Sequence, residues 1–274
     1  MGCQTFGDYH SIYLKTDVLL LADVFEQFRK TCSEYYQLDP ANYLTAPSLA
    51  WDAMLLLTGI QLELITDTKM LDMIERQKRG GLCFVGSKRC VKANNPYVED
   101  FNINEPTNYL MYWDANNLYG WAMSQHLPYE GLRFVEDVSL DNILQTPDEA
   151  DEGYIIECDL HFPPEIHDKL KEYPPCPENI EPQLEWFSEY QTEVATSCKA
   201  IKENGNYSAT CKLIPHLFDR KNYVLHYRVL KFVLELGAQV THINKVLTFK
   251  QKPWLKQYID FNTQKRTQAR NDFE

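Results

Sequence analysis

The chain has 274 residues, a formal net charge of −12 and 44% hydrophobic residues. This composition indicates a globular protein with buried cores, and no apolar run reaches the roughly 18 residues that a membrane-spanning helix needs. Its eight cysteines are scattered without a C-x-x-C pair, which favours reduced thiols in an intracellular protein over a disulfide framework or a zinc site.

The negative charge is concentrated in one segment. Residues 130–193 contain 18 acidic and 3 basic residues, so the rest of the chain has a net charge of +3. Residues 76–95 hold six basic residues and no acidic one, and residues 245–270 hold seven basic residues and a single acidic one. The two basic segments suit contact with nucleic acid, although each is also compatible with an ordinary solvated surface.

The first half of the chain predicts two helices and a turn. Apolar residues at three- and four-residue steps predict an amphipathic helix from Tyr13 to about Tyr36, with an apolar face of Leu14, Val18, Leu21, Phe25, Phe28 and Cys32. A second helix is expected from about Ser48 to Leu57. The paired glycines of Arg79–Leu82 predict a turn that leads into a strand at Cys83–Val85.

The second half predicts a strand, an insertion and two helices. Tyr109–Trp113 is β-prone and is followed by turn residues at Asn116 and Asn117. The proline-rich acidic block predicts an inserted subdomain, because it retains apolar residues. A helix is expected from Asn222 to Gly237, with Tyr223, Tyr227, Leu230 and Leu234 on its apolar face. The helix after Pro253 is expected to run to Glu274 without a cap, which suggests a truncated sequence.

The most specific stretch is Asp114-Ala115-Asn116-Asn117-Leu118-Tyr119-Gly120. A carboxylate at the end of a strand, followed by a tight turn, can hold a divalent metal at a cleft. Phosphoryl transfer needs such ligands, because metals neutralise the charge on the attacking and leaving oxygens. The alternative is an Asp that only caps the turn.

These residues resemble motif A of family B DNA polymerases, and D-A-N-N-L-Y-G-W-A-M is similar to the protein-primed polymerases of Maverick/Polinton-type transposons and related viral or organellar elements. The resemblance implies that Asp114 binds two Mg²⁺ ions and that the carbonyl of Ala115 helps to hold one. It implies that Leu118 and Tyr119 contact the incoming dNTP, with Tyr119 excluding a 2′-hydroxyl. Asn117 replaces the usual Ser, and Gly120 the usual Pro.

A second motif lies in the first predicted helix. Tyr13 and Asp17 are four residues apart and share a helical face, which is also compatible with a simple surface pair. The pair resembles the third proofreading exonuclease motif, Y-x-x-x-D. The resemblance implies that Asp17 is a metal ligand and that Tyr13 orients the attacking water. The carboxylates of the first two exonuclease motifs do not occur in this sequence.

The basic segments suggest contacts with DNA and nucleotide. Exposed amides at a glycine turn flanked by cations suit a phosphate backbone, and protein-primed polymerases carry a Y-x-G-G-like element at this place, with Lys78 standing here in the Tyr position. The resemblance implies DNA contacts from Arg79, Gly80, Gly81, Lys88, Arg89 and Lys92. Arg266 and Arg270 are one helical turn apart, so both could face a triphosphate; a solvated helix face is the alternative.

The acidic block lies where protein-primed polymerases insert a subdomain that meets a priming (terminal) protein, although an unrelated acidic insertion is equally compatible. The family's later elements, K-x-x-x-N-S-x-Y-G and D-T-D, do not occur in the sequence. We therefore expect an internal fragment that is catalytically inactive alone, since one carboxylate cannot hold two metals.

The sequence predicts an α+β fold that joins the tail of an RNase H-like 3′–5′ exonuclease domain to a partial polymerase palm. The expected segments are an exonuclease tail (1–36), a DNA-contacting connection (37–105), a palm core (106–129), an acidic insertion (130–210) and the start of the fingers (211–274). The expected function is Mg²⁺-dependent, template-directed addition of dNTPs to a 3′-hydroxyl in DNA replication. The alternatives are a non-catalytic DNA- or protein-binding remnant of a mobile element and an exonuclease-type hydrolase.

Overall fold

The computed structural model describes residues 2–84, 91–198, 200–201 and 210–270. The chain forms two compact units, each built from segments far apart in the sequence. Unit 1 comprises residues 1–63, 117–129 and 251–274, and unit 2 comprises residues 64–116 and 130–250. Of the expected segment boundaries, the one after residue 129 coincides with a boundary between units. The assignment of the segments to exonuclease, palm and fingers remains a prediction.

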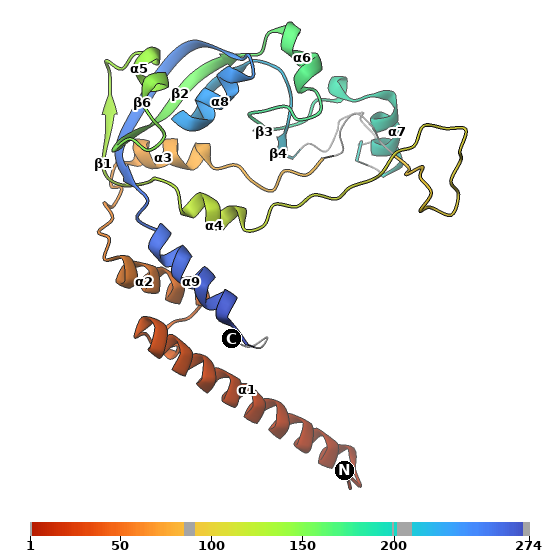
Figure 1. The fold of residues 1–274 in the computed structure, drawn as a ribbon, viewed down its shortest axis with the longest axis vertical. Coiled ribbons are helices and arrows are strands. Elements are labelled where there is room, and N and C mark those ends of the chain that lie inside the picture. Colours follow the sequence, from red (N-terminus) through yellow and green to blue (C-terminus); the bar gives the residue numbers. More distant parts are fainter. Residues whose placement is uncertain (1, 85–90, 199, 202–209, 271–274) are drawn as a thin grey trace. The chain divides into compact units, whose positions relative to one another are not determined.

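Unit 1 begins with the long helix α1 (Phe6–Tyr36) (Figure 1). A capping box starts it: Asp8 N donates to Thr5 Oγ1 at 3.2 Å, and Thr5 N donates to Asp8 Oδ2 at 2.9 Å, which satisfies backbone donors that the helix leaves open. Gln37 ends the helix in a left-handed conformation with φ 58°. The predicted helix is confirmed, but it begins at Phe6 instead of Tyr13.

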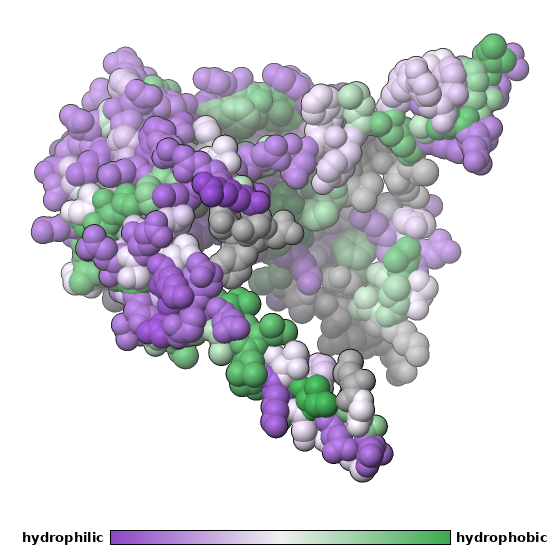
Figure 2. Space-filling model, turned by 60° about the horizontal axis from the view of Figure 1, so that its bottom comes forward, coloured by the Kyte–Doolittle hydropathy of each residue, from purple (hydrophilic) through white to green (hydrophobic). Residues whose placement is uncertain are grey.

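The apolar face predicted for α1 is exposed for most of its length. Leu21 is 69% exposed and Val18 57%, whereas Cys32 near the end of the helix is 3% exposed. The space-filling view likewise shows hydrophobic residues at the surface among hydrophilic ones (Figure 2). No helix in the described ranges has both the length and the apolar character needed to cross a membrane.

The C-terminal end of α1 packs in unit 1 with α2 (Ala46–Thr58), the short 3-10 helix η1 (Pro40–Asn42) and α9 (Lys256–Gln268). Arg29 grips Asp39 through two hydrogen bonds of 2.9 and 2.6 Å, and this pairing holds the pKa of the Asp39 carboxyl at about 2. Aromatic rings join the helices, and the hydroxyl of Tyr36 donates to Asn262 on α9. The predicted second helix is confirmed, with Gly59 at its end in the left-handed region (φ 61°).

The predicted last helix is confirmed in position but not in length. Helix α9 ends at Gln268, and Ala269 has a non-helical ψ of 134°, so the expectation of an uncapped helix running to the end of the sequence is wrong. Residues 271–274 lie outside the described ranges.

Unit 2 is built around an antiparallel arrangement of strands. Its sheet has the order β1-β6-β2-β5. The central strand β2 pairs antiparallel with β5 and with β6, for example Ile156 with Leu225 and with Val246. The strands are β1 (Leu127–Val135), β2 (Glu152–His161), β5 (Arg220–His226) and β6 (Gln239–Lys252). The expected mixed α+β character is confirmed.

Alternate side chains of β2 enter two different cores. Ile156 and Leu160 join the larger core, to which the helices α5 (Leu140–Gln145), α6 (Pro164–Leu170) and α8 (Tyr227–Glu235) contribute. Ile155 points the other way and packs with Met73 of α3 (Thr68–Gln77). Helices therefore lie on both faces of this sheet (Figure 1).

The acidic block belongs to unit 2 and contributes strands to its two sheets. It supplies β2 and β3 (Glu178–Ile180), and β3 pairs with β4 (Lys212–Ile214); the 3-10 helix η2 (Leu184–Trp186) and α7 (Glu189–Ser197) lie between these two strands. Some of its carboxylates meet the basic segments. The Glu157 side chain, 5% exposed, pairs with Arg76 and lies 3.6 Å from Lys245. Part of the charge pattern of the sequence thus serves internal pairing.

Two local predictions in unit 2 are wrong. Residues 222–226 belong to strand β5, and the helix predicted from Asn222 begins at Tyr227. The short apolar run Tyr223–Leu225 is compatible with the helical period of 3.6 and with the strand period of 2. It forms a strand because it pairs with β2. Cys83 and Phe84 are irregular instead of forming the predicted strand, and Val85 lies outside the described ranges.

A fully buried arginine ties the β3–β4 region to β5. Arg220, 0% exposed, donates to the carbonyl of Cys176 at 2.8 Å and to that of His216 at 2.6 Å. It also contacts the His216 ring nitrogen Nδ1 at 2.8 Å, while Nε2 lies 3.1 Å from Glu178. A neutral imidazole suits the first contact, because its Nδ1 can accept from the guanidinium; Nε2 is near Glu178 but makes no hydrogen bond to it. Burial and the neighbouring guanidinium accordingly lower the pKa of His216 to about 4.

Candidate functional site

The segment before Asp114 is extended and exposed, and it is not a strand. Its last backbone pairing is an isolated bridge between Asn94 and Asn108. Tyr112 is 92% exposed and Trp113 80%. The prediction of a strand at Tyr109–Trp113 is therefore wrong for this structure. A β-prone run becomes a strand only beside a hydrogen-bonding partner, and the described residues offer it none.

The predicted turn after Asp114 is present and starts a short helix, α4 (Leu118–Met123). Asn117 adopts the left-handed conformation (φ 54°), and its side chain accepts a hydrogen bond of 3.2 Å from Gly120 N. Leu118 is 58% exposed and Tyr119 86%. The motif thus presents an exposed aromatic ring on a capped helical turn in unit 1.

Asp114 and Ala115 are exposed and belong to unit 2. An exposed carboxylate is accessible to a metal ion, and Mg²⁺ in phosphoryl-transfer sites is commonly bound by one or two carboxylates together with substrate phosphates. Among the described residues, no three His, Cys, Asp or Glu side chains are grouped so as to hold a metal. Asp114 and the carbonyl of Ala115 would therefore supply only part of a Mg²⁺ site.

Tyr13 and Asp17 lie on α1 in unit 1, as the sequence predicts. Both are exposed, and the Tyr13 ring stacks on that of Tyr9 with centroids 6.4 Å apart. The predicted shared helical face is present. Their predicted roles in hydrolysis are not tested by this arrangement.

The glycine element is held on unit 2 by Arg79. Its guanidinium lies 3.9 Å above the centre of the Tyr223 ring and donates to the carbonyl of Val224 at 2.8 Å. Gly81 has a φ of 72°, as a glycine turn allows, whereas Gly80 does not require a positive φ. Residues 79–82 are irregular, so the turn predicted there is not formed. Arg79 therefore has a structural task that competes with contact to DNA.

The other cations proposed for DNA contact differ in their surroundings. Lys92 is exposed and pairs with Asp100, which raises the pKa of the Lys92 ammonium. Lys88 and Arg89 lie outside the described ranges. The side chain of Asn94 closes the loop that follows: its Nδ2 donates to the carbonyl of Asn102 at 3.0 Å, and its Oδ1 accepts from Asn102 N at 2.9 Å. Sequence reasoning missed this contact because the loop alone brings the two residues together.

Arg266 and Arg270 do not share a helical face. Arg266 lies in the last turn of α9, and Arg270 follows the end of that helix. Both are exposed. Lys265 is held over the Tyr35 ring, with its Nζ 4.0 Å from the ring centre. The predicted pairing of the two arginines at i and i+4 is thus not formed, and their role in nucleotide contact remains a prediction.

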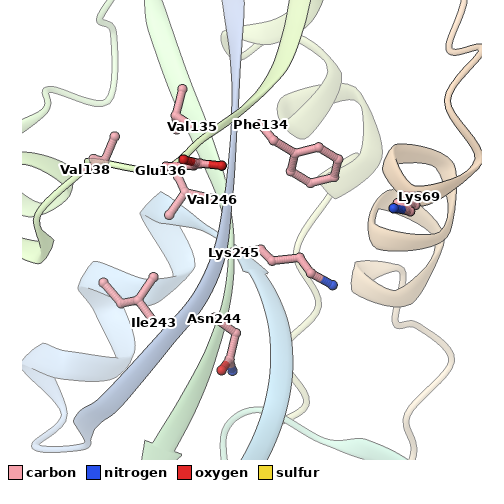
Figure 3. A pocket seen from close by; sticks show the side chains of 9 residues that line it. All are labelled: Lys69, Phe134, Val135, Glu136, Val138, Ile243, Asn244, Lys245 and Val246. Carbon is pink, nitrogen blue, oxygen red and sulfur yellow. The ribbon is translucent and has the colours of Figure 1, made fainter.

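Unit 2 contains two hollows that the sequence did not indicate. One of about 590 Å³ lies between α3 and the β1–β6 edge (Figure 3), where Lys69, Phe134 and Lys245 stand on one side of β6 and Val138 and Ile243 on the other. A second, of about 270 Å³, is lined by the basic residues Arg76, Lys78, Arg79 and Lys221 together with residues of β5. Of the predicted site residues that the structure describes, Arg79 alone lines either hollow.

The mixed α+β fold with its small antiparallel sheet fits a domain of the DNA polymerase class. The family model for organellar and viral type B DNA polymerases matches residues 5–274, and the chain belongs to this family. Its members bind DNA and dNTPs, act in DNA replication and depend in general on divalent metals. Searches of curated proteins and of solved structures found no match.

Proposed function

We propose that this chain supplies one carboxylate and the nucleotide-contacting turn of a template-directed DNA polymerase of the protein-primed type. The observation that carries the proposal is the stretch Asp114–Gly120, which lies within the family match and keeps Asp114 and Tyr119 exposed. The reaction is the addition of dNTPs to a 3′-hydroxyl. The proposal needs the turn that follows Asp114, which is present, and does not depend on a strand at Tyr109–Trp113.

The chain's own residues would act by holding and selecting the nucleotide. The exposed carboxylate of Asp114 and the carbonyl of Ala115 would ligate Mg²⁺, which supplies charge neutralisation during phosphoryl transfer when bound. The ring of Tyr119 would pack against the deoxyribose and exclude a 2′-hydroxyl, with Leu118 beside it. Arg266 and Arg270 would contact the triphosphate. Because one carboxylate cannot hold two metal ions, we expect the chain to be inactive alone.

DNA contact is proposed for the connection between the two motifs. Lys92 is exposed, and Gly80 and Gly81 present backbone amides without side chains, which suits a phosphate backbone. Lys88 and Arg89 complete the proposed set. The acidic segment is proposed to meet a basic surface of a priming protein. Tyr13 and Asp17 would contribute to a proofreading exonuclease site.

The second candidate is a chain that binds DNA or protein without catalysis, as a remnant of a mobile element would. The two candidates differ in what Asp114 does. If the chain is part of a polymerase, Mg²⁺ should strengthen nucleotide binding through this carboxylate. If it is a non-catalytic binding remnant, Mg²⁺ should not change nucleotide binding.

The test combines DNA binding, nucleotide binding and primer extension by the purified chain. We expect a fluorescent primer–template to bind with an affinity that falls as salt rises. Mg²⁺ should strengthen dNTP binding to this complex, and Asp114→Asn should abolish the Mg²⁺ effect. Asp137→Asn, at another exposed acidic residue, is the matched control.

Each result decides something. Lack of primer–template binding at low salt would refute the DNA contacts, and a Mg²⁺ effect that survives Asp114→Asn would refute the role of that carboxylate. Primer extension by the chain, abolished by Asp114→Asn, would support the polymerase function and overturn the expected inactivity.

A further inference from the structure

Asn117 and Gly120 are joined at the start of α4. The Asn117 side chain accepts from Gly120 N at 3.2 Å, and its backbone carbonyl accepts from Trp121 N at 3.0 Å. Asn117 holds a left-handed backbone, which asparagine tolerates better than most residues with a side chain. The first turn of α4 is therefore closed by one residue through both its side chain and its main chain.

The cap requires that residue 120 be glycine. Gly120 is buried, and a Cβ built there would lie 2.6 Å from both Cγ and Oδ1 of Asn117. This is much closer than carbon atoms approach without repulsion, so any side chain at 120 would push the amide of Asn117 away. The hydrogen bond would be lost even though the backbone of residue 120 still carries its N–H.

The two positions are also the two at which this sequence departs from the motif A pattern. Proline, the usual residue at the second position, has no N–H for Asn117 to cap. Serine, the usual residue at the first, accepts a left-handed backbone less readily than asparagine. Asn117 and Gly120 therefore form a matched pair, and exchanging either one alone removes the contact.

Tyr119 lies between the pair, and packing does not hold its ring. The side chain is 86% exposed, so the direction in which it leaves the chain is set by the backbone of the first turn of α4. That backbone is fixed by the left-handed conformation of Asn117 and by its hydrogen bond to Gly120. The orientation of Tyr119 therefore depends on the two residues that flank it.

We propose that Asn117 and Gly120 are a coupled positioning pair that orients Tyr119 for the selection of deoxyribose over ribose. The inference rests on the proposed polymerase function, because that function gives Tyr119 its contact with the sugar. It adds that sugar selection in this chain depends on the amide of Asn117 and on the missing side chain of Gly120.

The coupling itself is measured by amide hydrogen exchange at residue 120. Gly120→Ala should speed exchange about fivefold, which corresponds to the roughly 1 kcal/mol that loss of an N-cap typically costs, and Asn117→Gly about twofold, because glycine replaces an N-cap residue at a cost of only a few tenths of a kcal/mol. The double variant should exchange no faster than Gly120→Ala, because both changes remove the same hydrogen bond. Gly7→Ala is the control, since a Cβ there meets only Thr5 Oγ1 at an ordinary 3.5 Å.

The positioning role needs a readout that a purely structural cap would leave unchanged. Binding of 2-aminopurine deoxyribonucleoside triphosphate and of its ribose counterpart to the chain with primer–template gives a sugar preference. We expect Gly120→Ala to reduce this preference by up to about fivefold and Asn117→Gly by up to about twofold, the factors that the free energy of the cap can transmit. Asn117→Asp, which retains the accepting oxygen, should retain the preference, and Gly7→Ala should not alter it.

The outcomes separate this inference from the function on which it rests. Additive effects on exchange, or a sugar preference unchanged by Gly120→Ala, would overturn the inference while leaving the role of Asp114 intact. Equal binding of the two sugars by the wild-type chain would also overturn it, because there would be no selection to position. Loss of the Mg²⁺ effect in Asp114→Asn tests the proposed function separately.

Discussion

Replacement of Arg220 offers the sharpest test of how unit 2 is held together. The side chain is fully buried and donates to the carbonyls of Pro175, Cys176, His216 and Phe218. The same guanidinium lies 3.4 Å from a carboxylate oxygen of Glu178, whose side chain is 25% exposed. Methionine is of similar length and apolar, so Arg220→Met fills much of the space but donates nothing.

The expected loss follows from the partners that are left behind. A buried carbonyl deprived of its donor costs about 1 kcal/mol or more, and removing one partner of a buried ion pair costs roughly 3–5 kcal/mol. Since Glu178 is partly solvated, we expect Arg220→Met to lower the free energy of unfolding of unit 2 by about 3–5 kcal/mol. Arg133→Met is the matched control, because Arg133 is half-exposed, with 3.3 Å contacts to Glu152 and to the carbonyl of Gly131, and the change should have little effect.

Urea unfolding followed by circular dichroism measures the loss, and hydrogen exchange of the β2 amides assigns it to unit 2. Arg220→Lys keeps the charge but offers fewer donors in a different geometry, so it should fall between the wild type and Arg220→Met. A loss below about 1 kcal/mol in Arg220→Met would refute the view that this arginine organises the β3–β4 region.

Three further predictions follow. Burial lowers the pKa of His216 and of His226 to about 4, so between about pH 6.5 and 4 the unfolded chain binds more protons than the folded chain. The free energy of unfolding should therefore decrease as the pH is lowered through this range, by at most about 1.4 kcal/mol per pH unit for each histidine. Urea unfolding at pH 7.5 and 4.5 checks this, and greater stability at pH 4.5 would contradict it. Burial raises the pKa of Cys176 to about 11, so iodoacetamide at neutral pH should alkylate the exposed Cys198 far faster than Cys176. Mass spectrometry of the peptides measures the two rates, and equal labelling would contradict the burial of Cys176. Leu20 on α1 is 59% exposed, so the chain should associate at micromolar concentration and Leu20→Glu should weaken that association; sedimentation showing a wild-type monomer throughout would exclude it.

Local sequence signals predicted the helices of unit 1 well. The periodicity of α1, the glycine that ends α2 and the proline before α9 act within a few residues of the chain, so their consequences do not depend on the rest of the fold. The turn at Asn116 and Asn117 was predicted for the same reason. What the sequence did not give was the start of α1, because the capping box of Thr5 and Asp8 was not recognised.

The sheet of unit 2 was largely missed, because its strands are defined by distant partners. The polar and basic sequence of β6 shows little alternation, and its role as a strand comes from pairing with β2. Conversely, Tyr109–Trp113 has strong β propensity and no partner among the described residues. For the candidate site, the sequence predicted residue types and the turn. It could not predict that Arg79 is held by Tyr223 or that the cap of Asn117 depends on Gly120.

The central position of β2 has a consequence for synthesis on the ribosome. Its partners arrive late: Ile155 pairs with His226, and Glu152 pairs with Lys250. At about 5–20 residues per second, the roughly 70 to 100 residues between these partners take several seconds or more to be made. During that interval both edges of β2 lack their partners. The nascent chain would therefore depend on chaperones, or on rapid translation of the segment up to β6, to avoid pairing with other chains before β6 emerges.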